Sequence, residues 1–274
     1  MTIHNKQILT SSKEKDILPA GTILERLLYH EQHIPDKTLF VMLEDGKHEK
    51  ERITFGKLVH KAKAIAGVLR ENGKMGDRVL LLFPTGIEFI TSFFACFFAG
   101  MIAVPAYPPH RRKANQRFVS ILLDADPAII LTTKTIRSDL EYFDRNRKYV
   151  ANRSLINFEE IDFDMDVSFD DPGISSEDIA MLQYTSGSTG RPRGVMITHG
   201  NIMHNSECIR RSFGFDENLR GMNWLPNFHD MGLIGCLIQP AYVGGMNHII
   251  PPLKFLQNPL DWLDSIEKFQ ANNA

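Results

Sequence analysis

Short apolar runs alternate with longer amphipathic stretches through the middle of the chain. The apolar runs span residues 77–83, 101–104, 128–131 and 154–156, and the amphipathic stretches span residues 87–99, 115–123 and 138–147. Runs of this length that are apolar almost throughout are typical of strands whose two sheet faces are both covered. Strands that alternate with helices build right-handed crossovers and parallel sheets. The sequence therefore predicts an α/β fold of doubly wound, mostly parallel sheets flanked by helices.

The segments before and after this region also contain short apolar runs and amphipathic stretches, and these predict the remaining strands and helices. Further strands are expected at residues 39–43, 51–53, 179–184, 195–197, 222–225 and 248–250. Further helices are expected at residues 22–33, 54–72, 198–212, 233–242 and 259–269. Thr22, Thr54 and Thr198 are expected to cap three of these helices, because a threonine side chain satisfies free backbone N–H groups. The acidic segment 158–178 is expected to be a surface linker.

The most apolar part of the chain, residues 87–104, raises the question of a membrane span. A span needs roughly 20 consecutive apolar residues, whereas Glu88 interrupts this run, Gly100 breaks it and Pro105 ends it. Thr85 and Glu88 have the spacing of a capping box, and Gly100 suits the position that follows a helix end. We therefore expect a buried helix between two buried strands, and no membrane-spanning segment.

Charge and cysteine usage narrow the class of protein further. The net charge is −2 at pH 7, so bulk electrostatics favour neither a nucleic acid nor an anionic membrane as partner. Cys96, Cys208 and Cys236 lie far apart and form no C-x-x-C pair, which predicts buried thiols in a reducing compartment. Residues 1–19 are polar, lack the apolar core of a signal peptide, and are expected to form a poorly ordered tail. These features predict a cytoplasmic protein.

Residues 184–195 are rich in glycine, hydroxyl side chains and arginine, and they lie between two predicted strands. Glycines let the backbone turn its N–H groups toward a ligand, hydroxyls add donors, and arginine adds a planar charged fork that suits phosphate oxygens. This composition predicts a loop that binds an anion, most simply a polyphosphate. A Gly/Ser hairpin loop without a ligand is the alternative that composition leaves open. The spacing matches neither a Walker A motif nor a dinucleotide fingerprint.

Residues 185–194, Thr-Ser-Gly-Ser-Thr-Gly-Arg-Pro-Arg-Gly, closely resemble the phosphate-binding loop of adenylate-forming enzymes. That loop is written (S/T)-S-G-(S/T)-T-G-x-P-K-G, and every fixed position is matched except the lysine, which is Arg193 here. The resemblance implies that the loop holds the phosphates of ATP. The residues it implies are Thr185, Ser186, Gly187, Ser188, Thr189, Gly190 and Arg193. An arginine keeps the charge of the lysine but changes its geometry.

A second polar cluster follows the strand expected at residues 222–225. His229 and Asp230 lie where that strand gives way to a helix, and ligands bind at such strand ends in open α/β sheets. On the residues alone, a helix-capping aspartate beside a hydrogen-bonded histidine is the simpler explanation of the pair. A metal site would need further ligands that the sequence does not place nearby.

The segment 224–235, W-L-P-N-F-H-D-M-G-L-I-G, resembles the acyl-pocket motif of the fatty acyl-AMP ligases, a branch of the adenylate-forming enzymes. Residues 104–109, V-P-A-Y-P-P, resemble a turn typical of the same branch. This resemblance implies His229 as the catalytic residue. The implied substrate contacts are His229, Asp230, Met231 and Gly232. The basic residues 110–113 are expected to form a solvated loop, and contact with a carrier protein is the alternative.

The resemblance implies an enzyme that uses ATP and Mg²⁺ to convert a fatty acid to acyl-AMP and pyrophosphate. The acyl group then passes to the thiol of an acyl carrier protein rather than to coenzyme A. Two alternatives stay open. The first is an acyl-CoA synthetase or another adenylating enzyme, and the second is a non-catalytic module that binds a nucleotide or a carrier protein.

The resemblance covers about the first half of such enzymes. Residues 20–274 correspond to the N-terminal part of the adenylation domain. The sequence has no counterpart of the Mg²⁺-binding segment Y-G-x-(T/A)-E, of the ribose-binding aspartate, or of the catalytic lysine of the C-terminal domain. We therefore expect residues 1–274 to be a fragment that does not catalyse adenylation alone.

Overall fold

A computed structural model describes residues 21–109, 116–144, 149–164, 168–185 and 192–274 of the chain. The strands are β1 (Thr38–Leu43), β2 (Glu49–Thr54), β3 (Arg78–Leu82), β4 (Ile102–Ala106), β5 (Ile129–Thr132), β6 (Ser154–Asn157), β7 (Ile179–Thr185), β8 (Arg193–Thr198), β9 (Arg220–Asn223) and β10 (Met246–Ile249). The α-helices are α1 (Ile23–His33), α2 (Phe55–Asn72), α3 (Ile87–Phe98), α4 (Gln116–Ala125), α5 (Lys134–Asp144), α6 (His199–Phe213), α7 (Gln239–Val243), α8 (Pro252–Gln257) and α9 (Leu260–Lys268). A 3-10 helix, η1 (Phe158–Glu160), and a π-helix, η2 (Met231–Ile238), complete the described elements.

The strands form two mostly parallel sheets, which confirms the predicted fold class. In the six-stranded sheet, of order β6-β5-β3-β4-β7-β8, neighbouring strands are parallel except for the antiparallel pair β7 and β8. In the four-stranded sheet, of order β2-β1-β10-β9, strand β2 runs antiparallel to β1 and the other neighbours are parallel. Parallel strands need crossover helices, and these helices cover the faces of both sheets.

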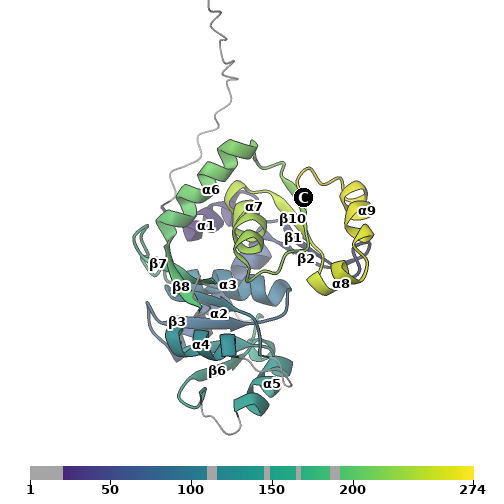
Figure 1. Cartoon of the computed structure of the whole chain (residues 1–274). Helices are drawn as coiled ribbons and strands as arrows, with labels where there is room; N and C mark the ends of the chain where they lie inside the picture. The colour runs from purple at the N-terminus through teal and green to yellow at the C-terminus, as the bar shows by residue number, and fades with distance from the viewer. Residues whose placement is uncertain (1–20, 110–115, 145–148, 165–167, 186–191) are drawn as a thin grey trace, which may run out of the picture.

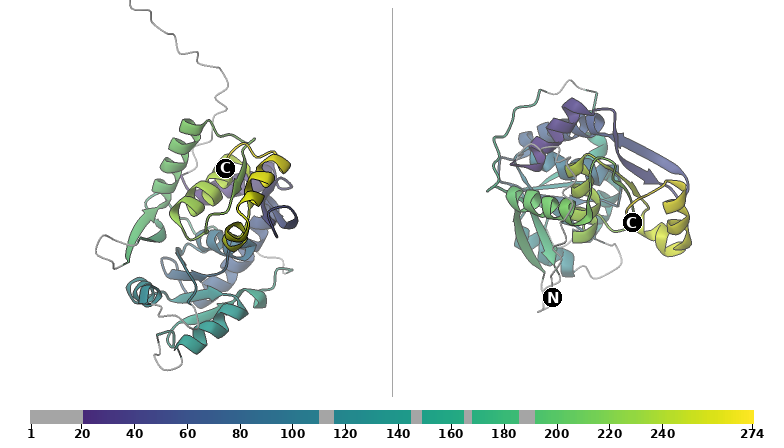
Figure 2. Two further views of the ribbon diagram at one scale, coloured as in Figure 1. Left: turned by 45° about the vertical axis from the view of Figure 1, so that its right-hand side comes forward. Right: turned by 90° about the horizontal axis from the view of Figure 1, so that it is seen from above.

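The helices and sheets pack in layers. Within β3, Val79 and Leu81 join the central core with α2 and α3, whereas Leu80 and Leu82 join a second core with α4 on the opposite face. The central core also takes side chains from β1 and β10, so α2 and α3 lie between the two sheets. A third core joins the outer face of the four-stranded sheet to α8 and α9. Figure 1 shows α4 and α5 with β6 in the lower part of the molecule and α8 and α9 at the right-hand edge, and Figure 2 shows this arrangement from two further sides.

Helix α3 is buried along its whole length, as the apolar run predicted. Of its 12 residues, 11 are buried, and four of its phenylalanine rings contact one another. Gly100 follows the helix with φ 68°, a left-handed conformation that glycine adopts without strain. The predicted capping box at Thr85 is wrong, because Gly86 is the N-cap and no side chain caps the helix. In the described part of the chain, no helix has both the length and the apolar character needed to cross a membrane.

Two predictions around residues 222–242 need correction. Strand β9 ends at Asn223, so Trp224 and the residue after it lie in the loop beyond the strand. The helix expected at residues 233–242 begins instead as the π-helix η2 and continues as α7. Pro240 has no N–H to donate to the carbonyl of Cys236, and the side chain of Asn247 donates to that carbonyl over 2.6 Å. The proline therefore accounts for the irregular hydrogen bonding at this point.

Smaller differences concern element ends and one thiol. Helix α5 begins at Lys134 rather than at residue 138, and α8 was not predicted. Cys208 is exposed, in contrast to the prediction of buried thiols, because it lies on the outer side of α6. The three predicted caps are confirmed, because Thr22, Thr54 and Thr198 each accept a hydrogen bond from a backbone N–H in the first turn of the following helix.

Two buried histidines make the stability of this fold depend on pH. Burial lowers the pKa of both His30 and His199 to about 4, since a charged imidazolium loses its hydration there. An unfolded histidine titrates near 6.5, so the folded state loses stability as the pH falls from about 6.5 toward 4. We expect the free energy of unfolding to drop by about 2 kcal/mol for each of the two histidines between pH 7 and pH 5.

Urea unfolding at several pH values measures this effect. The variant His30→Gln removes one titrating ring and should show a shallower loss of stability between pH 7 and pH 5 than the parent chain. His33 is exposed, so His33→Gln is the matched control and should leave the slope unchanged. Equal slopes for the parent and His30→Gln would contradict this account.

Candidate functional site

The candidate site lies at the carboxyl ends of two neighbouring parallel strands. Strands β4 and β7 pair in register at Ala103 and Met181, so their carboxyl ends reach the same edge of the six-stranded sheet. Beyond β4 the chain continues as Tyr107, Pro108 and Pro109, and β7 ends at Thr185. Ligands of open α/β proteins bind at this kind of sheet edge, because the loops beyond the strands leave a crevice there.

Gln183 joins this edge to the loop that carries His229. Its side chain is 6 % exposed, and its Nε2 donates a hydrogen bond of 2.9 Å to the backbone carbonyl of Phe228. The two residues are 45 positions apart in the sequence and belong to β7 and to the loop beyond β9. The hydrogen bond therefore holds His229 next to the end of β7, and it leaves Oε1 of Gln183 without a partner among the described residues.

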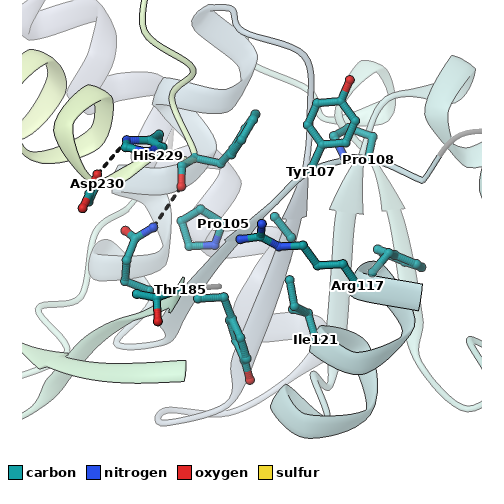
Figure 3. A pocket seen from close by; sticks show the side chains of 13 residues that line it. Pro105, Tyr107, Pro108, Arg117, Ile121, Thr185, His229 and Asp230 are labelled. Carbon is teal, nitrogen blue, oxygen red and sulfur yellow. Dashed lines mark hydrogen bonds and ion pairs between the residues drawn. The ribbon is translucent and has the colours of Figure 1, made fainter. Parts of the chain in front are cut away.

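A cavity of about 520 Å³ opens between β4, β7, α4 and this loop. Its lining residues are Pro105, Ala106, Tyr107, Pro108, Arg117, Phe118, Ile121, Gln183, Tyr184, Thr185, Phe228, His229 and Asp230. Figure 3 shows Thr185 and His229 on one side of the cavity and Arg117 and Ile121 on the other. The cavity has the size of a small-molecule site and combines apolar walls with a few polar groups.

His229 and Asp230 form an exposed pair at one side of the cavity. Nδ1 of His229 lies 2.6 Å from a carboxylate oxygen of Asp230, and the two side chains are 60 % and 63 % exposed. The same carboxylate oxygen accepts a hydrogen bond of 2.7 Å from the backbone N–H of Met231 and caps η2. Asp230 therefore caps a helix beside a hydrogen-bonded histidine, as the simpler explanation from the sequence expected. The same two residues also line the cavity. Because Asp230 takes Nδ1, Nε2 of His229 stays available to a ligand.

Aromatic side chains form the remaining walls of the cavity. The rings of Tyr107 and Phe228 meet edge to face with centroids 5.3 Å apart. The hydroxyl of Tyr184 donates a hydrogen bond of 2.6 Å to Asp124, and burial together with this bond raises the pKa of Tyr184 above its usual value. Tyr184 therefore stays neutral and anchors the end of β7 against α4.

The structure brings together some of the residues predicted from the sequence. Thr185, His229 and Asp230 line the cavity. Arg193 lies on β8 opposite Thr185, is exposed, and does not line the cavity. Met231 and Gly232 lie on η2, outside the cavity lining. The predicted phosphate-loop residues Ser186, Gly187, Ser188, Thr189 and Gly190, and the basic residues 110–113, lie outside the described residues.

Two polar residues of the cavity were not predicted from the sequence. Gln183 stands alone as a polar side chain within the apolar strand 179–184, and that contrast is a signal that could have identified it. Arg117 lies in the first turn of α4, close to other basic residues, and nothing in its sequence context distinguishes it from a solvated arginine. The structure alone shows that it lines the cavity.

A second cavity, of about 490 Å³, lies beside η2 and β9. Its lining is mostly apolar and includes Phe213, Phe215, Met222, Trp224 and Met231. Asp230 lines the first cavity and Met231 lines the second, so the two cavities border on consecutive residues. A cavity with charged groups next to a mostly apolar one suits a ligand with a charged head and an apolar chain.

The fold and the first cavity are typical of the class of proteins that bind a small molecule at the strand ends of a parallel α/β sheet. Residues 29–273 match the family described as AMP-binding enzyme, and the chain belongs to this family. It is 33 % identical over 258 residues to JamA of Moorena producens, a medium-chain fatty acid acyl-carrier-protein ligase, covering 93 % of this chain and 44 % of JamA.

Another relative is FadD23 of Mycobacterium tuberculosis, a long-chain-fatty-acid–AMP ligase, with 32 % identity over 84 % of this chain and 41 % of FadD23. A solved structure, the fatty acyl-adenylate ligase from L. pneumophila in complex with acyl adenylate and pyrophosphate, is similar with a TM-score of 0.85 and 38 % identity. That match covers 95 % of this chain and 45 % of the solved one. The chain thus spans less than half the length of the relatives it matches.

Gly232 is expected to be essential to the loop that carries His229. A Cβ atom at this position would lie 2.4 Å from the carbonyl oxygen of Pro226 and 3.1 Å from Cβ of Leu225. We expect Gly232→Ala to lower the free energy of unfolding by about 1–3 kcal/mol, because the crowded backbone must move. Urea unfolding measures this loss.

Gly235 provides the matched control on the same helix. A Cβ atom there has no neighbour within 4 Å, so Gly235→Ala should cost no stability. Equal destabilisation by the two substitutions would show that crowding at Pro226 is not the cause.

Proposed function

We propose that the protein containing this chain activates a fatty acid with ATP, in the cytoplasm, and forms acyl-AMP and pyrophosphate. The observation that carries the proposal is the cavity that Thr185, the first residue of the predicted phosphate loop, lines together with His229 and Asp230. Relatives named as fatty acid ligases share this part of their length with the chain. Residues 20–274 then form the N-terminal part of the adenylation domain.

The phosphates of ATP would be bound at the end of β7. Thr185 lies at that end, and Ser186, Gly187, Ser188, Thr189 and Gly190 follow it in the sequence. Arg193, across the hairpin from Thr185, would add positive charge near the pyrophosphate. In the reaction, a carboxylate oxygen attacks the α-phosphorus, the bond to the bridging oxygen breaks, and pyrophosphate leaves. Such a step depends on positioning and on neutralisation of charge.

The fatty acid would place its carboxylate near His229 and its chain in the second cavity. Nε2 of His229 is the ring nitrogen that Asp230 does not use, and it would orient the carboxylate or bind the adenylate phosphate. Met231, two residues after His229, lines the apolar cavity. Gly232 lets η2 approach the backbone of Pro226 in the loop beyond β9. The charged head and the apolar chain would thus meet chemically matched walls.

Mg²⁺ would accompany ATP, but the described residues offer no dedicated site for it. No group of three or more His, Cys, Asp or Glu side chains in the described part of the chain is arranged to hold a metal ion. Mg²⁺ usually binds through substrate phosphates and one or two carboxylates. The ion would neutralise charge on the triphosphate.

The acyl acceptor would be the thiol of an acyl carrier protein. JamA, which covers most of this chain at 33 % identity, is named as a ligase for such a carrier. The acyl-adenylate would be the intermediate that persists until the carrier thiol attacks its carbonyl carbon and releases AMP.

Product analysis by mass spectrometry tests this function. The complete protein is incubated with ATP, Mg²⁺ and fatty acids of several lengths, with and without coenzyme A and a carrier protein bearing its phosphopantetheine arm. We expect acyl-AMP to persist in the presence of coenzyme A and to be consumed when the carrier is added. Conversion to acyl-CoA would assign the protein to the acyl-CoA synthetases, and absence of any adenylate would favour a binding module.

Substitution of His229 tests the role of the loop beyond β9. We expect His229→Ala to lower kcat/KM for adenylation on the order of 10²-fold, because a polar group that positions the reacting carboxylate or phosphate is lost. His204, an exposed histidine on α6, serves as the control, and His204→Ala should leave the rate unchanged. An unchanged rate for His229→Ala would remove this residue from the reaction.

A further inference from the structure

Arg117 reaches into the cavity from the side opposite Thr185 and His229. It is the second residue of α4, which has 10 residues, and it is exposed. Figure 3 shows its side chain extending from α4 across the cavity toward Pro105. Among the described residues that line the cavity, Arg117 is the only lysine or arginine.

The charge of Arg117 has no partner among the described residues. The carboxylate of Asp230, which lines the same cavity, is bonded to His229 and to the backbone of Met231. The carboxylate of Asp124, on the same helix, accepts the hydroxyl of Tyr184. One oxygen of each carboxylate is therefore bonded to another group, and no hydrogen bond or ion pair among the described residues occupies the five donors of the guanidinium. Its place in the first turn of α4 adds the favourable field of a helix N-terminus for an anion.

Gln183 lines the same cavity and holds the loop that carries His229 through its Nε2. Its Oε1 is buried and has no partner among the described residues, so this atom is not offered to the cavity. The anion-binding group that the cavity receives from α4 is therefore the guanidinium of Arg117.

We propose that Arg117 binds a phosphate group of the ligand that occupies this cavity. A planar guanidinium binds phosphate oxygens through two parallel hydrogen bonds. The proposal rests on the function proposed above, which brings two phosphate-bearing molecules to the site: ATP, and the phosphopantetheine arm of the carrier protein.

The test uses the complete protein and three variants. Arg117→Gln removes the charge, Arg117→Lys keeps the charge without the fork, and Arg137→Ala is the control. Arg137 is an arginine on α5 that pairs with Glu141 over 2.8 Å and does not line the cavity. Because Arg117 is exposed, none of these changes removes core packing, and circular dichroism with thermal unfolding checks that each variant is folded.

Two half-reactions identify the source of the phosphate. Exchange of labelled pyrophosphate into ATP reports on the nucleotide, and transfer from preformed acyl-AMP to the carrier reports on the phosphopantetheine arm. We expect Arg117→Gln to raise the KM for one of these ligands about tenfold, with kcat changed less than twofold, Arg117→Lys to fall between, and Arg137→Ala to match the parent. A higher KM for ATP would show that Arg117 binds a phosphate of the nucleotide. A higher KM for the carrier protein would show that it binds the phosphate of the phosphopantetheine arm. Unchanged KM values for both would overturn the proposal.

Direct binding separates this inference from the proposed function. Calorimetric titration with pyrophosphate and with phosphopantetheine needs no catalytic turnover. If the parent protein forms no acyl-AMP, the proposed function fails, and weaker binding of either probe to Arg117→Gln than to the parent still supports a phosphate site. Equal binding of both probes to the parent and to Arg117→Gln would overturn the inference on its own.

Discussion

The packing of helix α3 between the two sheets is the constraint on which the rest of the structure depends. Its buried phenylalanine side chains belong to one core that also contains residues of β1 and β3, which lie in different sheets. A close-packed interior transmits position, because a shift of one layer leaves voids or clashes in the next. The two sheets are therefore fixed relative to each other, and so are the loops beyond their strands. The site uses this geometry, since β7 belongs to one sheet and the loop after β9 follows a strand of the other.

The hydrogen bond from Gln183 to the carbonyl of Phe228 completes this junction at the site itself. A buried amide that bonds a backbone carbonyl across two elements fixes both more firmly than an exposed contact would. It places His229 beside Thr185 without using either side chain, so the hydroxyl of Thr185 and Nε2 of His229 remain available to a ligand. Arg117 faces them from α4, which the Tyr184–Asp124 bond ties to β7. The cavity is thus held by groups that are distinct from the groups offered to a ligand.

Much of the fold could be predicted because local signals and tertiary packing agree. The strands 77–83 and 128–131 and the three threonine caps depend on patterns within a few residues, and the structure shows each of them close to its predicted place. The π-helix η2 was not predicted, although Pro240 lies inside the helix expected at residues 233–242. The side chain of Asn247, in β10, makes the hydrogen bond that Pro240 cannot make, and a helix pattern does not show such a contact between elements. Gly86 replaced Thr85 as cap for a similar reason: several residues can cap a helix, and packing selects one.

The candidate site divides in the same way. Thr185, His229 and Asp230 were predicted because motifs mark them, and they lie in one cavity. Gln183 is marked only by its polarity within an apolar strand, and nothing near Arg117 in the sequence marks it, because both line a cavity formed by segments that are far apart in the sequence. A burial pattern or a motif reveals what one segment does, whereas a cavity depends on which segments the layers bring together.

The central claim is that the cavity lined by Thr185 and His229 receives the adenylate, with the acyl chain continuing past Met231 into the apolar cavity. A crystal structure of the complete protein with a non-hydrolysable acyl-adenylate analogue tests this most directly. The account predicts the phosphate of the analogue within hydrogen-bond distance of Thr185 or of Nε2 of His229, and the chain between Trp224 and Met231. An analogue bound elsewhere, with both cavities filled only by solvent, would contradict it.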